Sequence, residues 1–229
     1  ARGIYNILMC GRYNIITDAQ ALVDYFDVLN EIDFSPRYNI APSQDVPVVR
    51  QQDAGRELAL LHWGLIPFWA KDEKLKYSMI NARADTVHEK PAYREAFKKR
   101  RCLIPASGFY EWRKEKGRKQ PYNIRLKDTD IFAFAGLWEH WEGPEGEVID
   151  SCSIIVTEAN KLIEPIHDRM PVILSTKGYD TWLDPDNHNT NTLRDLLTPY
   201  PPAKMECYPV STVVNNARNE GADLIKEKY

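Results

Sequence analysis

Residue types suited to nucleophilic or acid–base chemistry lie in short polar blocks of this 229-residue sequence. Cys10 follows Met9 in "LMCGRY", so loss of the preceding residues would leave an amine and a thiol on one residue. Glu111 in "GFYEW" and His167 in "IHDRMP" supply a carboxyl group and an imidazole, both of which can move protons. Each also has a structural alternative: a buried cysteine, a strand residue facing solvent, and a histidine bonded to a carbonyl. Single motifs therefore leave both roles open.

Asn81 and Arg83 lie two positions apart in "INARADT". On an extended segment, side chains at this spacing point to the same face. That arrangement suits a pair that contacts one ligand, and it equally suits the anchor of a loop.

The elements that must position these residues are short and mostly β. Helical spacing predicts a helix from Thr17 or Asp18 to about Asn30, and Pro91 can open another in "PAYREAFKKR". Two further short helices are predicted at Ser175 to Leu183 and Asn191 to Leu197. Predicted strands are "DVPVV", "LALLHWGL", "CLIPASGFYEW", "PYNIRL", "IFAFAGLW", "CSIIVT", "PVIL" and "MECYPV". Consecutive strands favour an α+β fold, with a mostly antiparallel, curved or barrel-like sheet and a few short flanking helices.

Composition narrows the class of protein. Apolar residues make up 43% of the chain, but the apolar runs are strand-sized and far shorter than a membrane-spanning helix. The four cysteines are widely spaced, which argues against a metal site and a disulfide framework. We expect a cytoplasmic protein in which residues 1–9 are a tag, a misassigned start or a leader, and residues 10–229 form a single domain.

Charge is unevenly distributed along the chain. Ten basic and two acidic residues lie between Lys98 and Arg125, whereas the net charge of the whole chain is -3. This segment could attract a polyanion to one face, or it could be a solvated hairpin tip.

The blocks together resemble the SOS-response-associated peptidase (SRAP) family, whose members act as abasic-site processing proteins that crosslink to abasic sites in single-stranded DNA. The resemblance extends in the family's order over "MCGRY", "RYNIAPSQ", "WGLIPFWAKD", "INARADT", "SGFYEW", "IHDRMPVIL" and "PVSTVVNN". One position departs from the family pattern, because Asp85 stands where the family has glutamate. We assign that change no role from the sequence.

The resemblance implies a role for each matching position. The nucleophile would be Cys10, the cysteine that follows the methionine. The other catalytic residues would be Asn81, Glu111 and His167. Arg12 and Arg83 match residues that hold DNA phosphates, and Trp69 matches an aromatic residue of the DNA channel. The expected partner is single-stranded DNA containing abasic sites, bound by a monomer without metal, other cofactor or membrane, and located at the nucleoid when bound to DNA.

The chemistry follows from cysteine itself. An α-amine is partly unprotonated at neutral pH and can add to the aldehyde of an opened abasic sugar, which forms an imine. The thiol of the same cysteine can then close onto the imine carbon to give a thiazolidine. The imine also permits β-elimination, so weak lyase activity is expected.

Two other functions remain open. A thiol peptidase could use Cys10 with His167 and Glu111 or Asn81, if only to remove its own leader. Alternatively, the protein could be a non-catalytic binding module in which Cys10 is structural.

Overall fold

Two β-sheets carry most of the fold in the computed structural model, which describes residues 10–115 and 117–228. The first sheet has the strand order β13-β8-β7-β1-β2 and the second has the order β11-β10-β4-β3-β6-β9-β12, with β5 paired to β10. The strands are β1 Tyr13–Ile15, β2 Arg37–Ile40, β3 Asp45–Gln52, β4 Gly55–Trp63, β5 Asn81–Arg83, β6 Arg101–Ala106, β7 Gly108–Glu115, β8 Arg118–Leu126, β9 Phe132–Glu142, β10 Val148–Glu158, β11 Arg169–Pro171, β12 Ile173–Leu174 and β13 Met205–Pro209.

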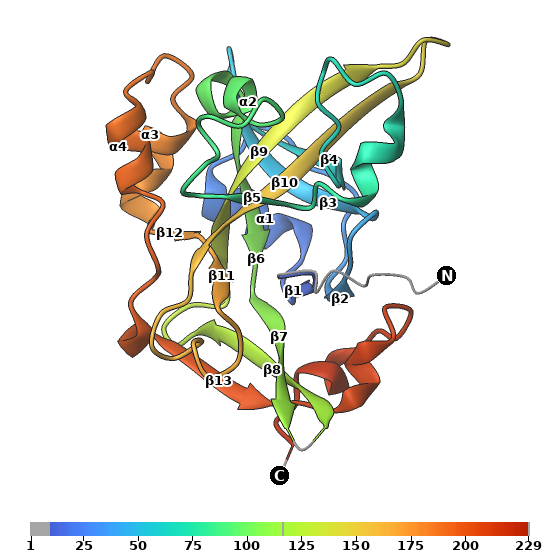
Figure 1. Ribbon diagram of the computed structural model, residues 1–229, viewed down its shortest axis with the longest axis vertical. Helices are drawn as coiled ribbons and strands as arrows, with labels where there is room; N and C mark the ends of the chain where they lie inside the picture. The colour runs from blue at the N-terminus through green and yellow to red at the C-terminus, as the bar shows by residue number, and fades with distance from the viewer. Residues whose placement is uncertain (1–9, 116, 229) are drawn as a thin grey trace.

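The second sheet closes on itself into a five-stranded barrel. Strand β10 pairs with β9 on one edge and with β4 on the other, which joins β10, β4, β3, β6 and β9 in a ring. The β10–β4 and β10–β5 pairs are parallel, and the other pairs are antiparallel. Figure 1 shows β9 and β10 crossing the molecule as a long hairpin, and it shows the β7–β8 hairpin at the lower end of the molecule. The predicted α+β, mostly antiparallel and barrel-like fold is confirmed.

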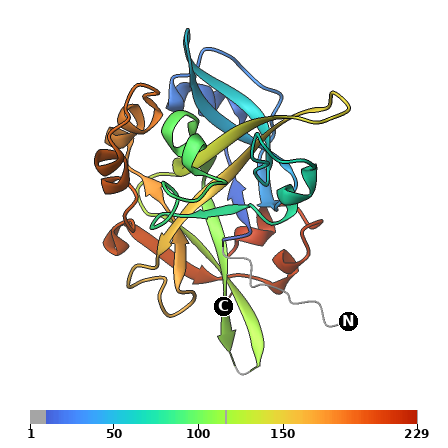
Figure 2. The same cartoon turned by 45° about the horizontal axis from the view of Figure 1, so that its top comes forward.

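A buried serine joins the two sheets. The backbone N–H of Ser107 donates to the Asn14 carbonyl (2.8 Å), and the Ser107 hydroxyl accepts from the N–H of Ile16 (3.1 Å). These bonds tie β1 to the point where β6 ends and β7 begins. The segment "CLIPASGFYEW", predicted as one strand, is therefore two strands in different sheets, and β7 continues outward in a hairpin that projects from the body (Figure 2).

Short helices flank the barrel. They are α1 Ala19–Phe26, α2 Arg94–Lys99, α3 Tyr179–Leu183 and α4 Thr190–Asp195, with 3-10 turns η1 Glu73–Tyr77, η2 Thr176–Gly178, η3 Pro202–Lys204, η4 Thr212–Asn215 and η5 Ala222–Ile225. The predicted cap of α1 is confirmed, because the Asp18 carboxylate accepts the N–H of Ala21 at 2.9 Å.

Two predicted helix bounds were wrong. Helix α1 ends at Phe26 because Asp27 takes a left-handed conformation (φ 52°), and Leu29 then bonds to the Arg56 carbonyl and is 69% exposed. Helix α2 begins at Arg94, after a hydrogen-bonded turn that includes Pro91.

Gly64 fixes the loop that follows β4. It has φ +143°, and a Cβ atom at this position would lie 1.9 Å from the carbonyl oxygen of Lys76. Only glycine permits this close approach of two backbones. The loop is held further by the indole N–H of Trp141, which donates to the Ala70 carbonyl at 2.8 Å. The segment "WGLIPFWAKD" is thus fastened at both ends while the side chain of Trp69 stays 50% exposed.

Arg101 holds two helices against the barrel. Its buried guanidinium donates to the carbonyls of Phe97 and Lys98 at the end of α2 (both 2.7 Å) and to that of Trp182 in α3 (2.6 Å). It also bonds to the carbonyls of Asp184 and Asn187. Burial lowers the pKa of Arg101 to about 10, so the side chain is still charged at neutral pH. One cation satisfies carbonyls that would otherwise lack partners in the interior.

We expect Arg101→Met to lower the free energy of unfolding by about 3 kcal/mol, because the buried carbonyls lose their donors. Urea denaturation followed by circular dichroism measures the change. The control is Arg118→Met at the exposed start of β8, which should change stability little. Equal stability of the two variants would contradict the anchoring role of Arg101.

Candidate active site

The backbone nitrogen of Cys10 faces the carboxylate of Glu111. The N–H donates to Oε1 at 2.9 Å, and the two residues are only 2% and 3% exposed. The register of the first sheet sets this contact: Tyr13 lies opposite Phe109, and the N–H of Tyr110 donates to the Arg12 carbonyl (2.9 Å). Continued backwards, this register would place Gly11 opposite Glu111, and the nitrogen that meets the Glu111 side chain belongs to the residue before it, Cys10. The group held against the acid is therefore the cysteine nitrogen.

Burial governs the acid–base state of this pair. The pKa of Glu111 is raised to about 8, chiefly by burial and also by the charge of Asp168, while the backbone N–H groups of Cys10 and Trp112 oppose the rise. Burial also raises the pKa of the Cys10 thiol well above its ordinary value, and Glu111 adds to this effect. The thiol is thus neutral at rest, unlike the thiolate of an activated cysteine peptidase. A carboxyl group with a pKa near neutrality can both give and accept protons.

His167 lies just before β11 and is largely buried. Its Nδ1 accepts the backbone N–H of Arg169 at 3.1 Å and is 3.0 Å from Oδ1 of Asp168. Because Nδ1 accepts this hydrogen bond, the proton of the neutral ring resides on Nε2. Because Asp168 also acts on Glu111, the histidine and the buried acid share one electrostatic neighbour.

Asn81 and Arg83 lie on β5, which pairs in parallel with β10 through Asn81 opposite Ile154 and Arg83 opposite Val156. Because Asn81 and Arg83 are two positions apart on this strand, their side chains lie on the same face of it, as predicted. Nδ2 of Asn81 is buried and has no hydrogen-bond partner among the described residues. An unpaired buried amide is costly, so this donor is suited to a ligand. Arg83, in contrast, is half-exposed.

Arg12 and Trp69 occupy different surroundings. Nη1 of Arg12 donates to Oδ1 of Asn39 and to the Val214 carbonyl, both at 2.8 Å, and its guanidinium lies 5.8 Å from the centre of the Trp112 ring. Arg12 therefore has structural bonds as well as a predicted binding role. In the part of the chain that the structure describes, no hydrogen bond joins Asn81 or Trp69 to the Cys10–Glu111 pair.

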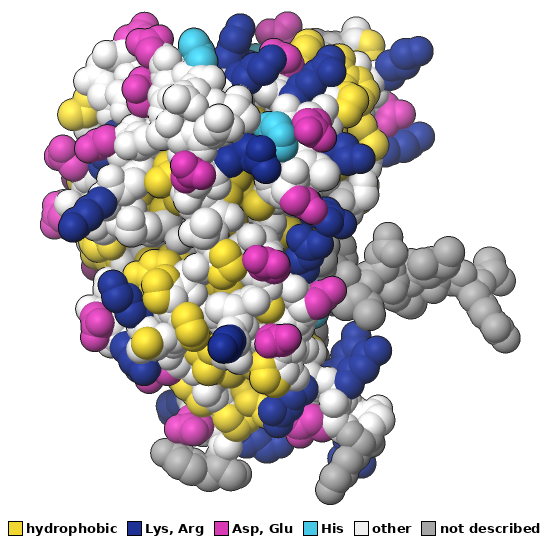
Figure 3. All heavy atoms as spheres, turned by 60° about the vertical axis from the view of Figure 1, so that its left-hand side comes forward, with side chains coloured by type: hydrophobic (Ala, Val, Ile, Leu, Met, Phe, Trp, Pro, Cys, Tyr) yellow, Lys and Arg dark blue, Asp and Glu magenta, His cyan; other side chains and the backbone are white. Residues whose placement is uncertain are grey.

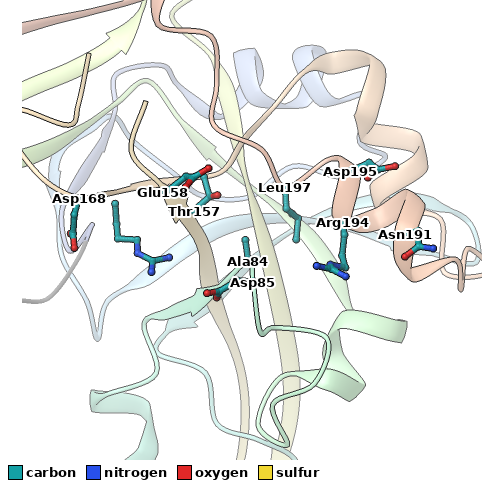
Figure 4. Close-up of a pocket in the computed structure, with 10 residues that line it drawn as sticks. Ala84, Asp85, Thr157, Glu158, Asp168, Asn191, Arg194, Asp195 and Leu197 are labelled. Carbon is teal, nitrogen blue, oxygen red and sulfur yellow. The ribbon is translucent and has the colours of Figure 1, made fainter. Parts of the chain in front are cut away.

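A polar cavity of about 640 Å³ opens beside His167 and Arg83. Figure 4 shows Ala84 and Asp85 on one side of it and the residues of α4 on another. It is lined by Ala84, Asp85, Thr157, Glu158, Asp168, Arg169, Asn191, Arg194, Asp195 and Leu197. Sequence reasoning missed Asp168 and Arg169 as site residues although "IHDRMP" contains both, and the residues of α4 carried no signal.

The basic segment from Lys98 to Arg125 does not form one surface. Lys98 and Lys99 are in α2, Arg101 is buried, and Arg113 lies on the β7–β8 hairpin at the other end of the molecule (Figure 1). On the face that includes α3 and α4, basic and acidic side chains are interspersed (Figure 3). Charge alone therefore does not mark a single polyanion-binding face.

Residues 10–115 and 117–228 contain neither a metal-ligand cluster nor a membrane-spanning helix. No group of three or more His, Cys, Asp or Glu side chains there could hold a metal ion. The helices of this part of the chain include none that is long and apolar enough to cross a membrane.

Several known proteins are similar to this chain in sequence. The sequence pattern of the SOS response associated peptidase (SRAP) family matches residues 9–217. "Abasic site processing protein YoqW" of Bacillus subtilis is 45% identical over 222 residues, which cover 95% of this chain and 99% of that protein. "Abasic site processing protein HMCES" of Xenopus tropicalis is 36% identical over 217 residues, which cover 81% of this chain and 64% of that protein.

The fold is shared as well. A crystal structure of a protein from Bacteroides thetaiotaomicron superposes with a TM-score of 0.88 at 28% identity, covering 96% of this chain and all of the other. The matched sequence pattern and the extent of the curated relatives lead to one conclusion: this chain belongs to the SOS response associated peptidase (SRAP) family.

Proposed function

We propose that this protein is an abasic-site processing protein that binds single-stranded DNA and forms a thiazolidine crosslink with the abasic sugar through the amine and thiol of Cys10. The observation that carries the proposal is the 2.9 Å contact between the Cys10 nitrogen and the buried Glu111 carboxylate. A proton carrier at the nitrogen is what imine formation requires. The names of the relatives, abasic site processing proteins, support the same substrate.

The proposed reaction has three steps. The free amine of Cys10 adds to the C1′ aldehyde of the opened sugar, and the resulting carbinolamine loses water to give an imine. Glu111 takes a proton from the nitrogen and returns one to the departing oxygen. The thiol then adds to the imine carbon and its proton goes to the nitrogen, so one water is released overall. His167 assists opening of the sugar ring through Nε2, and the unpaired amide of Asn81 orients the sugar.

The DNA strand is proposed to contact both sides of this centre. Arg83, half-exposed at the end of β5, would hold a phosphate, and Trp69 would stack on a base from the loop after β4. Arg12 would hold a second phosphate with the donors that Asn39 and Val214 leave free. We also propose a monomer with residues 10–229 as one domain, and a cytoplasmic, nucleoid-associated location.

A second activity, removal of the preceding residues, is favoured by the same contact. The Cys10 nitrogen is the leaving group if the bond to residue 9 is cleaved. A protonated Glu111 could donate to it while the thiol attacks the carbonyl of residue 9, which gives a thioester that water hydrolyses. The high pKa of the thiol disfavours a general peptidase, so this activity would be confined to the protein's own chain. Residues 1–9 lie outside the described residues.

The state of the Cys10 nitrogen should decide whether a crosslink forms. We expect protein that begins at Cys10 to give a heat-stable adduct with single-stranded DNA containing one abasic site. The 229-residue chain, in which this nitrogen is acylated, should bind without the adduct unless it is cleaved first. Denaturing gels measure the adduct, and mass spectrometry of the protein establishes the first residue. The matched control is the Cys10→Ser variant of the shortened chain, which begins at position 10 and should give only a heat-labile imine.

Equal adduct from both chains, persisting after Cys10→Ala, would contradict this chemistry.

Glu111→Gln should slow crosslinking by about a hundredfold or more, because the amide cannot transfer the proton, while DNA affinity stays the same. Single-turnover gel assays give the rate and fluorescence anisotropy gives the affinity. The control is Glu142→Gln, an exposed carboxylate at the end of β9. An unaltered crosslinking rate would remove Glu111 from the mechanism.

Glu111 should also make stability depend on pH. Its pKa is about 8 in the folded protein against an ordinary value of 4.5, so the folded state binds the proton more tightly. The stabilisation from the protonated form is complete below the ordinary pKa and is lost as the pH rises to about 8. Urea unfolding from about pH 5 to about pH 9 should show a smaller loss for Glu111→Gln than for the wild type, and parallel curves would contradict the raised pKa.

Arg83→Gln should weaken binding to all single-stranded sequences by the same factor and reduce the slope of log K against log salt by about 0.7, the value for one phosphate on a single strand. Anisotropy titrations at several salt concentrations measure both. Arg94→Gln, which removes an arginine of similar exposure paired to its neighbour Glu95 on α2, is the matched control. If the salt slope of Arg83→Gln equals that of the wild type, Arg83 holds no phosphate. Arg12 is the poorer test, because its loss also breaks two internal bonds.

A further inference from the structure

Asp85 occupies the donors that a DNA phosphate would need. Its carboxylate meets Arg83 through two contacts, Nε to Oδ1 at 3.1 Å and Nη2 to Oδ2 at 2.5 Å. This two-point arrangement is the one in which a guanidinium binds either a carboxylate or a phosphate. The pair is local, since the two residues are two positions apart at the end of β5. A phosphate arriving at Arg83 therefore meets a site that already holds an anion.

The pair is accessible from solvent. Both side chains are 51% exposed, so a strand lying over β5 reaches them without any rearrangement of the interior. Ion pairs in water are weak, because each partner retains much of its hydration and salt screens the attraction. A phosphate can therefore displace the carboxylate, but the affinity it gains is reduced by the contacts it replaces.

The guanidinium of Arg169 also acts on the Asp85 carboxylate. Arg83 holds the pKa of Asp85 below its ordinary value, and the charge of Arg169 acts in the same direction. Asp85 and Arg169 both line the polar cavity, whose lining has four carboxylates, Asp85, Glu158, Asp168 and Asp195, against two guanidiniums, Arg169 and Arg194. Figure 4 shows Asp85 at the edge of this cavity, opposite α4. The carboxylate of Asp85 thus reduces the positive charge that Arg83 and Arg169 present to the strand.

We propose that Asp85 is a specificity-determining residue that competes with DNA phosphate for Arg83 and so weakens retention on undamaged single-stranded DNA. This inference rests on the proposed function. Phosphate contacts are the same on intact and abasic strands, so they add affinity without selecting the lesion. Weakening them shortens the time spent on intact DNA, whereas an abasic site is retained by the covalent bond to Cys10. Selection of the lesion then depends on the chemistry at Cys10 and Glu111.

Substitution of Asp85 tests the proposal directly. The affinities of wild type, Asp85→Asn and Asp85→Glu for undamaged single-stranded DNA are measured by anisotropy at several salt concentrations. We expect Asp85→Asn to bind about three- to tenfold more tightly at low salt and to steepen the salt slope by about 0.7, because a full phosphate contact at Arg83 is restored. Asp85→Glu keeps the charge and should bind like the wild type.

The matched control is Asp180→Asn. Asp180, which is on α3, also pairs with an arginine, Arg56, at 2.5 Å. Removing the Asp180 charge therefore changes the net charge by the same amount without affecting Arg83. Tighter binding by Asp85→Asn alone supports the proposal. Unchanged or weaker binding by Asp85→Asn, an equal gain for Asp180→Asn, or an equal gain for Asp85→Glu would overturn it.

Crosslinking separates this inference from the proposed function. With abasic strands mixed into an excess of undamaged strands that saturates the protein, Asp85→Asn should form adduct more slowly than the wild type, because its slower release from intact DNA limits the rate at which it reaches a lesion. If wild-type protein that begins at Cys10 binds DNA but forms no adduct, the proposed function fails, and the binding comparison still decides whether Asp85 competes with phosphate. If the wild type binds no DNA, both fail.

Discussion

The hydrogen bond from the Cys10 nitrogen to the Glu111 carboxylate lies in the interior, where neither group meets water. Its surroundings decide its chemistry. A carboxyl group deprived of solvent keeps its proton to higher pH, and a donor held against it stays in place because no water competes. The contact between Cys10 and Glu111 depends on the registers of β1, β7 and β8. A shift of β7 by one residue would turn Glu111 to the opposite face of the sheet.

The same burial separates two kinds of cysteine chemistry. A peptidase needs a thiolate at rest, and an apolar interior beside an acid opposes that charge. In the proposed reaction the amine acts first and the thiol follows, so a neutral thiol is no obstacle: it need lose its proton only when an imine carbon is in reach. The surroundings that make Cys10 a poor peptidase nucleophile therefore suit it to crosslinking.

Binding groups and reacting groups occupy different dielectric surroundings. Glu111 and the amide of Asn81 are enclosed, where interactions are strong and geometry is fixed. Arg83 and Asp85 are in contact with water, where the same charges interact weakly and can exchange partners. The protein has a net charge of -3, and its basic segment is divided between α2 and the β7–β8 hairpin. The proposed affinity for DNA thus depends on a few placed side chains and not on a general positive surface.

By itself, the sequence determined the strand content, the barrel-like α+β class, a cap of α1 at Thr17 or Asp18 and the family to which the chain belongs, because these depend on local spacing and on short motifs. It did not determine where α1 ends, since the chain after the left-handed Asp27 is held by the backbone bond from Leu29 to Arg56 in β4. Only the tertiary structure brought the Cys10 nitrogen to Glu111, 101 residues away, and left Nδ2 of Asn81 without a partner among the described residues. The reason is physical: burial, and with it the pKa of an acid or a thiol, is set by what packs around a residue and not by its neighbours in sequence.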